Sequence, residues 1–394
     1  MAVNLTNADK ALKTVYLDAV SEQLNGSTNP LLAKIKQSTE DVWGKEVRKL
    51  AIYGVNGGVG AGTEEGTLPK SHGNNYGQFV STLKNLYGTI EITDKAIRAS
   101  ENNSGAFVNL LNAEMEGLVK ASSFNFGRML FGDGSGILAI ANYGEEDGTI
   151  KVDSTKNIIE GMVIDIRYND CEDIVSNLEG IRVLSVDREK NTIKTTGRIE
   201  DVMSIGDGSY VTVQGSFKNE ITGIKKIFDK NATELYGINK ADNKWLNPYV
   251  KENVGEIDEI TLQTALDAIE ERSGSSVNFI VCSWGVRRAL QKAMSISNVR
   301  MNSVVLDGGF KAISYNGIPI VADRFCPDGT MYLLNTDDFT LHQLCDWQWL
   351  AGDDGKILQQ IPGKPVYTAT LVKYAELLCG KPYGQGMLSG ITEA

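Results

Sequence analysis

The chain has 394 residues, of which 23% are charged and 42% hydrophobic, a composition typical of a folded protein with more than one domain. Its 39 basic and 50 acidic side chains give a net charge of −11, which disfavours a protein that works by neutralising a phosphate backbone. The five cysteines are widely spaced and none forms a Cys-x-x-Cys pair, so reduced thiols are expected in place of a disulfide framework or a zinc site.

The first hundred residues favour an extended region over a compact domain. Residues 7–25 carry apolar residues on one helical face, which predicts an amphipathic helix that packs on its own domain or, as an arm, on a neighbouring subunit. Residues 42–53 are typical of a strand, and residues 79–87 of a strand that returns beside it. Between them, residues 54–77 hold eight glycines and hardly any apolar side chain. Together these segments predict a long two-stranded finger.

A long helix is predicted from residue 104 to residue 131. Apolar side chains recur at helical spacing, at Phe107, Leu111, Met115, Leu118, Phe126 and Met129. Gly132 and Gly134 follow the last of these residues and are expected to end the helix. At 1.5 Å per residue the helix is about 40 Å long, so we expect it to act as a rigid spine.

A β-rich module is predicted after the helix. Short strand patterns alternate with turn signals over residues 148–216, at residues 162–166, 181–186, 192–195 and 210–213. The spacing predicts a small barrel or sandwich. Helical and mixed patterns resume on both sides, so the module is interpreted as an insertion.

From residue 221 onward the pattern predicts an α/β region. Its expected elements are a helix that ends at Gly274, a strand at 277–282, a helix at 286–293, a hairpin turning at Asn316 and Gly317, strands at 331–334 and 339–344, and a long strand at 366–378.

The sequence offers no catalytic constellation. Only two histidines are present, His72 in the glycine-rich segment and His342 in a predicted strand, so structural or surface roles are expected for both. Gly58, Gly60 and Gly62 imitate a dinucleotide-binding fingerprint, but the residues that follow cannot open the helix such a site requires. Residues 229–234 begin like a calcium loop but have Glu234 where the turning glycine should be. No catalytic, cofactor-binding or metal-binding residue is therefore predicted, nor any cofactor, and no membrane span, because no stretch reaches the length one needs.

Several segments together resemble the major capsid proteins of tailed bacteriophages. They are residues 86–97 (LYGTIEITDKAI), 107–115 (FVNLLNAEM) and 128–136 (RMLFGDGSG), with Leu68-Pro69 in the finger, and Tyr374 to Leu378 followed by Lys381-Pro382. The order of the parts carries the resemblance, which extends over most of the chain. It implies an α+β protein with the Hong Kong-type capsid fold, which encapsulins share.

The resemblance also implies a division of the chain. We expect a 1–46 N-terminal arm, a 47–87 extended loop, an 88–147 peripheral domain with the spine helix, a 148–217 inserted β-rich domain, a 218–360 axial domain with part of the peripheral domain, and a 361–394 C-terminal strand returning to the core. Lys70 is a lysine in the extended loop, but nothing identifies a partner for an isopeptide bond, so no covalent cross-link is inferred.

The implied function is a non-enzymatic shell subunit. Hexamers and pentamers of the chain would assemble into an icosahedral shell that encloses double-stranded DNA without sequence-specific binding. The implied location is the virion, with assembly in the host cell cytoplasm, and scaffolding, portal and decoration proteins are the further partners. The alternatives are an encapsulin-type compartment and an α/β nucleotide-binding enzyme.

Overall fold

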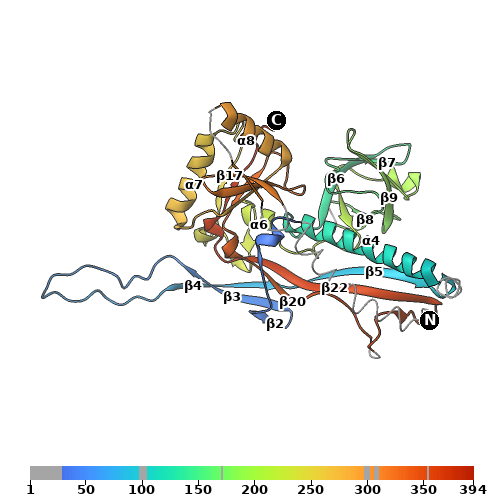
Figure 1. Ribbon diagram of the computed structural model, residues 1–394, viewed down its shortest axis with the longest axis horizontal. Coiled ribbons are helices and arrows are strands. Elements are labelled where there is room, and N and C mark those ends of the chain that lie inside the picture. The colour runs from blue at the N-terminus through green and yellow to red at the C-terminus, as the bar shows by residue number, and fades with distance from the viewer. Residues whose placement is uncertain (1–28, 97–103, 170–171, 297–301, 306–309, 353–354) are drawn as a thin grey trace. The chain divides into compact units, whose positions relative to one another are not determined.

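The spine helix connects the two compact units of the chain. The computed structural model describes residues 29–96, 104–169, 172–296, 302–305, 310–352 and 355–394. Unit 2 is Asn125–Ile224, and unit 1 holds the residues before and after it. Helix α4 (Ser104–Leu130) begins in unit 1 and ends in unit 2 (Figure 1). The predicted spine helix is confirmed, and the helix predicted at residues 7–25 lies outside the described residues.

The finger of unit 1 is an antiparallel sheet in the order β2-β3-β4, which continues into two long arms (Figure 1). Its strands are β2 (Val42–Trp43), β3 (Glu46–Tyr53) and β4 (Asn75–Thr82). β3 and β4 pair from Glu46↔Thr82 to Tyr53↔Asn75, which confirms the two-stranded finger. The return strand, however, starts at Asn75 and not at residue 79. It also ends at Thr82, because the residues from Lys84 onward join another sheet.

A second sheet of unit 1 packs against α4. Its strands are β1 (Lys36–Ser38), β5 (Lys84–Thr93), β20 (Phe339–Trp349), β21 (Gln359–Gln360) and β22 (Val366–Cys379). β22 confirms the predicted long strand and pairs with β20 and β5. A Cβ atom on Gly88 would lie 2.9 Å from Leu118 Cδ1, so glycine at this position allows the helix to approach the sheet closely.

The α/β region of unit 1 is a sheet with two helices on one face. The sheet runs in the order β14 (Tyr249–Lys251), β23 (Gly386–Leu388), β19 (Met331–Leu334), β15 (Phe279–Cys282), β18 (Ile318–Ala322), β17 (Lys311–Tyr315) and β16 (Asn302–Val305). Helices α7 (Glu259–Ser273) and α8 (Trp284–Ile296) share one hydrophobic core with it. Both helices and the strand between them match the sequence predictions.

Local signals explain this region well. Asp258 caps α7 by accepting a hydrogen bond from the Thr261 amide, and Gly274 ends the helix with a φ of 61°. Asn316 and Gly317 have φ values of 49° and 83°, the left-handed pair that a type I′ hairpin between β17 and β18 requires.

Unit 2 contains a closed six-stranded barrel. Its order is β10 (Thr192–Thr195), β7 (Thr149–Val152), β6 (Ile137–Gly144), β11 (Ser209–Val213), β8 (Val163–Arg167) and β9 (Ile181–Asp187). The barrel-like insertion is confirmed. Strand β6, however, lies before residue 148, where the sequence placed the start of the module. β6 carries Leu138, Ala139 and Ala141 as buried residues without a strict alternation, so its strand pattern is weak.

A buried ion pair fixes the end of α4 within unit 2. Arg128 donates to both carboxylate oxygens of Glu220, at 2.9 and 2.5 Å, and both side chains are buried. A Cβ atom on Gly223 would lie 2.3 Å from the Met129 carbonyl oxygen. Only glycine therefore allows the chain that returns from the barrel to pass the helix end at this distance.

The remaining described elements are short. They are η1 (Leu32–Lys34), α5 (Ile199–Val202), α6 (Ile224–Phe228), β12 (Glu234–Leu235), β13 (Ile238–Asn239), η2 (Lys244–Leu246), η4 (Thr336–Asp338) and η5 (Pro382–Gly384).

Candidate assembly surface

Aromatic side chains from distant parts of unit 1 anchor the base of the finger. Phe79 of β4 is fully buried, with its ring centroid 5.3 Å from that of Tyr236 and 5.8 Å from that of Trp245. Tyr53 of β3 stacks on Trp245 at 4.5 Å with nearly parallel rings. A Cβ atom on Gly77 would lie 3.0 Å from the Trp245 ring, so this glycine lets the indole lie against the ribbon. Sequence reasoning missed both Tyr236 and Trp245, since no local pattern links them to the finger.

The opposite face of the ribbon is apolar and uncovered. Leu50, Ile52 and Tyr76 are 60%, 58% and 55% exposed. Ile52 lies directly across from Tyr76 in the β3–β4 register, and Leu50 is two residues away on the same face. The alternation along β3, which buries Val47 and Ala51, points these side chains outward.

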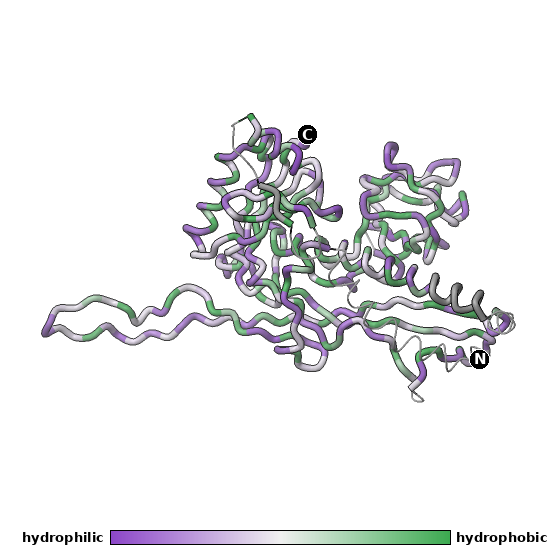
Figure 2. The backbone as a smooth tube through the Cα atoms, viewed as in Figure 1, coloured by the Kyte–Doolittle hydropathy of each residue, from purple (hydrophilic) through white to green (hydrophobic). Residues whose placement is uncertain are grey.

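The arms beyond the ribbon, residues 54–74, form a preshaped hairpin without a core of its own. The Asn56 amide donates to the Asn74 amide oxygen across the arms at 2.9 Å, and the amide of Gly66 closes the tip turn on the Thr63 carbonyl at 3.0 Å. The apolar side chains along the arms are more than 80% exposed, at Val55, Val59 and Leu68. The tip itself is hydrophilic (Figure 2).

This arrangement is suited to binding another protein surface. A two-stranded ribbon is at best marginally stable in water, and contiguous exposed apolar side chains are typical of interaction sites. The finger is held at its base by the aromatic cluster, while its outer face and arms have nothing to bury their apolar residues within the described part of unit 1. It presents both side chains and backbone groups for docking.

The chemical candidates of the sequence lie in separate places, apart from Gly58 and His72, which face each other across the arms of the finger. Gly58, Gly60 and Gly62 lie in one arm of the finger, and no helix follows them. His72 packs beside Gly57 in the opposite arm, and Lys70 is exposed. Asp229 caps a local turn by accepting from the Asn231 amide at 2.8 Å. The structure therefore does not bring any of these side chains into one site.

His342 has a structural setting. Its side chain is buried, and Nδ1 lies 3.0 Å from the Glu40 carbonyl oxygen. Nδ1 donates this hydrogen bond, since a carbonyl can only accept. Burial lowers the pKa of the imidazole below its usual value. The bond fixes the chain just after β1 against β20.

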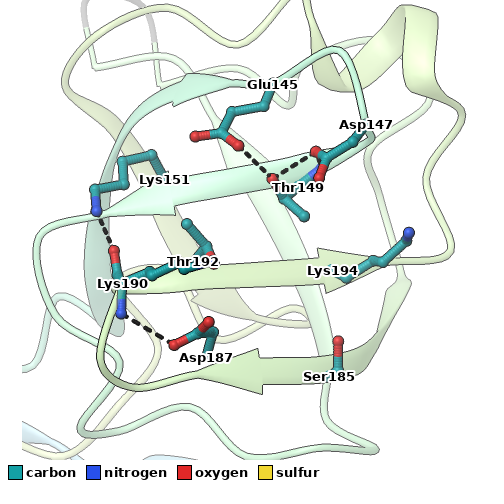
Figure 3. A pocket seen from close by; sticks show the side chains of 9 residues that line it. All are labelled: Glu145, Asp147, Thr149, Lys151, Ser185, Asp187, Lys190, Thr192 and Lys194. Atoms are coloured by element: carbon teal, nitrogen blue, oxygen red, sulfur yellow. Dashed lines mark hydrogen bonds between the residues drawn. The ribbon is translucent and has the colours of Figure 1, made fainter.

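A polar groove of about 430 Å³ lies on the outside of the barrel (Figure 3). Its lining side chains come from β7, β9, β10 and their turns, and are Glu145, Asp147, Thr149, Lys151, Ser185, Asp187, Lys190, Thr192 and Lys194. The Thr149 hydroxyl lies 2.9 Å from the Glu145 carboxylate and 2.7 Å from that of Asp147, and its hydrogen bonds lower the pKa of Asp147. The groove mixes carboxylates with lysine ammonium groups, so it carries both signs of charge.

The described residues include buried cysteines. Cys282 and Cys379 are buried free thiols, and burial raises the pKa of Cys282 to about 12. Cys326 is also buried. Within the described ranges, no three His, Cys, Asp or Glu side chains gather as metal ligands would. No described helix is both long and apolar enough to cross a lipid bilayer.

Comparison with known proteins finds likeness in structure and not in sequence. No protein-family model matches the chain, and no curated protein is significantly similar to it. The capsid asymmetric unit of cyanophage A-1(L) matches 94% of this chain and 92% of its own, with a TM-score of 0.55 and 11% sequence identity. The holo-SrpI encapsulin of Synechococcus elongatus matches 93% and 89%, with a TM-score of 0.46 and 9% identity. The capsid of an empty GTA particle matches 93% and 91%, with a TM-score of 0.46 and 11% identity.

The cyanophage likeness extends over nearly the whole of both chains and shows that this chain has the phage capsid fold. The predicted resemblance to tailed-phage capsid proteins, with a barrel added to the fold, is thereby confirmed. At 11% identity the likeness shows the fold alone.

Proposed function

We propose that this chain is the major capsid protein of a tailed bacteriophage, which self-assembles as hexamers and pentamers into an icosahedral shell around double-stranded DNA. The protein acts in the virion and assembles in the host cell cytoplasm, with scaffolding, portal and decoration proteins as further partners. The expected arm, extended loop, peripheral, inserted and axial domains are part of this proposal. It has no enzymatic activity.

The observation that carries the proposal is the uncovered finger on a chain with the capsid fold. Leu50, Ile52 and Tyr76 form an apolar face more than half exposed, and the arms hold no core. In a shell, the finger of one subunit covers its neighbour, and the neighbour buries these side chains. Contacts between copies then bury apolar surface that the isolated subunit leaves exposed, which stabilises the assembled form.

Many such contacts add up in a closed lattice. Each one can be weak enough to break and reform during assembly, which allows errors to be corrected, while the closed shell retains all of them at once. The net charge of −11 suits a container that does not trap its own polyanionic contents.

An encapsulin-type compartment is the second candidate, because encapsulins share this fold. The contents of purified particles separate the two, since a phage shell holds double-stranded DNA and a compartment holds protein cargo. An α/β nucleotide-binding enzyme is the candidate from another class. Size-exclusion chromatography tests it, because an enzyme elutes as a small oligomer and a shell protein as rings or megadalton particles.

Removal of the finger arms tests the proposal directly. We would replace residues 54–74 with Asn-Gly, a two-residue turn that suits the strands joined at Tyr53 and Asn75. We expect the variant subunit to fold, with an unchanged circular dichroism spectrum. Electron micrographs should show that it no longer forms closed particles. Normal shells from this variant would refute the role of the finger.

A further inference from the structure

Helix α7 carries an acidic stripe on the side that faces away from its sheet. Leu262, Ala265 and Ile269 are buried in the core of the α/β region. Along the opposite side, exposed residues lie at helical spacing, and are Ile260, Thr264, Asp267, Glu270 and Glu271. The one exposed basic residue of α7, Arg272, lies in its last turn and donates to the Pro248 carbonyl oxygen. Ile260, in the first turn, is 74% exposed. We call these five residues the acidic stripe.

Helix α8 carries a basic stripe with the same layout. Val286, Leu290 and Met294 are buried in the same core. The exposed residues of the basic stripe are Trp284, Arg288, Gln291, Lys292 and Ser295, and Ile296 is exposed at the helix end. α8 contains no acidic residue at all. Trp284, in the first turn, is 48% exposed and lies under the Arg287 guanidinium at 4.7 Å.

The two stripes are complementary in charge. Their intramolecular partners are local, since Arg288 Nε donates to the Ala394 carbonyl oxygen at 2.5 Å and Asp267 accepts from the Gln263 side-chain amide at 2.6 Å. Each begins with a large exposed apolar residue, and the charged residues within each stripe have one sign. Both helices pack on the sheet face that bears Ile280 and Cys282, so both stripes point away from the same core. Within the described part of unit 1, no ion pair joins an α7 carboxylate to an α8 cation. Like charges along one helix repel, so each stripe gains from an opposite surface supplied by another molecule.

We propose that the acidic stripe of one subunit binds the basic stripe of the next, and that this head-to-tail contact closes the capsomer ring. The occupant of each stripe is a second copy of this chain. A contact between two different patches of one protein is heterologous and produces rings when the rotation between copies closes. This inference rests on the proposed shell function and adds the residues that set the order of subunits around the ring.

Charge reversal tests the contact in four forms of the full-length protein. The acid-reversed variant is Asp267→Lys/Glu271→Lys, the base-reversed variant is Arg288→Glu/Lys292→Glu, and the fully reversed variant combines the four substitutions. We expect each single reversal to raise the concentration needed for assembly on the order of tenfold, because attraction across the contact becomes repulsion. The fully reversed variant should regain assembly, since its stripes are again complementary. Circular dichroism and thermal unfolding show that each variant is folded.

Mixing the two single reversals gives a sharper readout. One variant then has two basic stripes and the other two acidic stripes, so complementary contacts exist only when the two alternate. An alternating ring closes with six members but not with five. We expect an equal mixture to form hexameric rings without closed shells, visible by electron microscopy.

The control for the acid-reversed variant is Glu179→Lys/Glu189→Lys, which makes the same change in net charge at exposed barrel residues and should assemble as the wild type does. Single reversals that assemble like the control would overturn the inference, and so would a folded, fully reversed variant that stays unassembled. Loss of assembly from base reversal alone would indicate a nucleic-acid surface on α8 and would also overturn it. A wild-type protein that forms neither rings nor shells would instead refute the proposed function.

Discussion

Replacing Trp245 with alanine should loosen the finger without unfolding the subunit. The indole stacks on Tyr53 at 4.5 Å and packs 5.8 Å from Phe79. Aromatic pairs of this kind contribute about 0.5–1.5 kcal/mol each beyond the area they bury, so loss of both contacts costs about 1–3 kcal/mol. The free-energy cost falls on the ribbon, which keeps the Phe79–Tyr236 contact and the hydrogen bond from the Val80 amide to the Tyr236 carbonyl oxygen. The open state of the ribbon should therefore become roughly 5- to 150-fold more populated without full release.

Amide hydrogen exchange of the unassembled protein measures this opening. Peptides from β3 and β4 should exchange faster in Trp245→Ala by that factor, while peptides from the barrel strand β9 should be unchanged. Trp43→Ala is the matched control, because Trp43 is 71% exposed on the neighbouring strand β2. Equal protection of β3 and β4 in wild type and Trp245→Ala would show that the aromatic cluster does not hold the finger.

Two further predictions concern buried polar groups. His342→Asn keeps a donor for the Glu40 carbonyl but cannot titrate. Burial lowers the pKa of His342 below the ordinary value of 6.5. The neutral imidazole therefore stabilises the folded state fully above pH 6.5, and this contribution is lost as the pH falls from 6.5 through the lowered pKa of the folded state. The thermal midpoint of the wild type should therefore drop more than that of His342→Asn between about pH 7.5 and pH 5.5, and equal drops would contradict this reasoning. Arg128→Met should cost about 3–5 kcal/mol in urea unfolding, because it leaves Glu220 buried and uncompensated, whereas Arg128→Met/Glu220→Leu should cost less than about 1 kcal/mol; a double variant as unstable as the single one would argue against this account.

Elements with strong local signals could be predicted from the sequence. Helix α7 has a cap at Asp258 and a left-handed end at Gly274, and the β17–β18 hairpin has its own turn residues. In such cases short-range chemistry and tertiary structure favour the same conformation. The spine helix and β22 were predictable for a related reason, since a long periodic pattern is hard to imitate by chance.

Other features depend on contacts that no local pattern records. The break between β4 and β5 arises because Thr82 ends the pairing with β3 and Lys84 begins the pairing with β22, although the chain is extended throughout. The anchoring of the finger by Trp245 joins residues far apart in the sequence. The acidic and basic stripes were visible in principle, because the spacing of charges along α7 and α8 can be read once the buried side of each helix is known.

An exposed apolar finger could make the free subunit aggregate, and the composition of the finger limits this aggregation. A long, flat, apolar strand edge would pair with any other chain. Here the arms are rich in glycine, which weakens strand pairing, and the tip carries Glu64 and Glu65, which repel the tips of other copies. The apolar residues are spaced along the arms and do not form a continuous run (Figure 2). The finger can therefore dock only where a surface offers several matched contacts at once, which is the condition that an assembling lattice meets and a chance encounter does not.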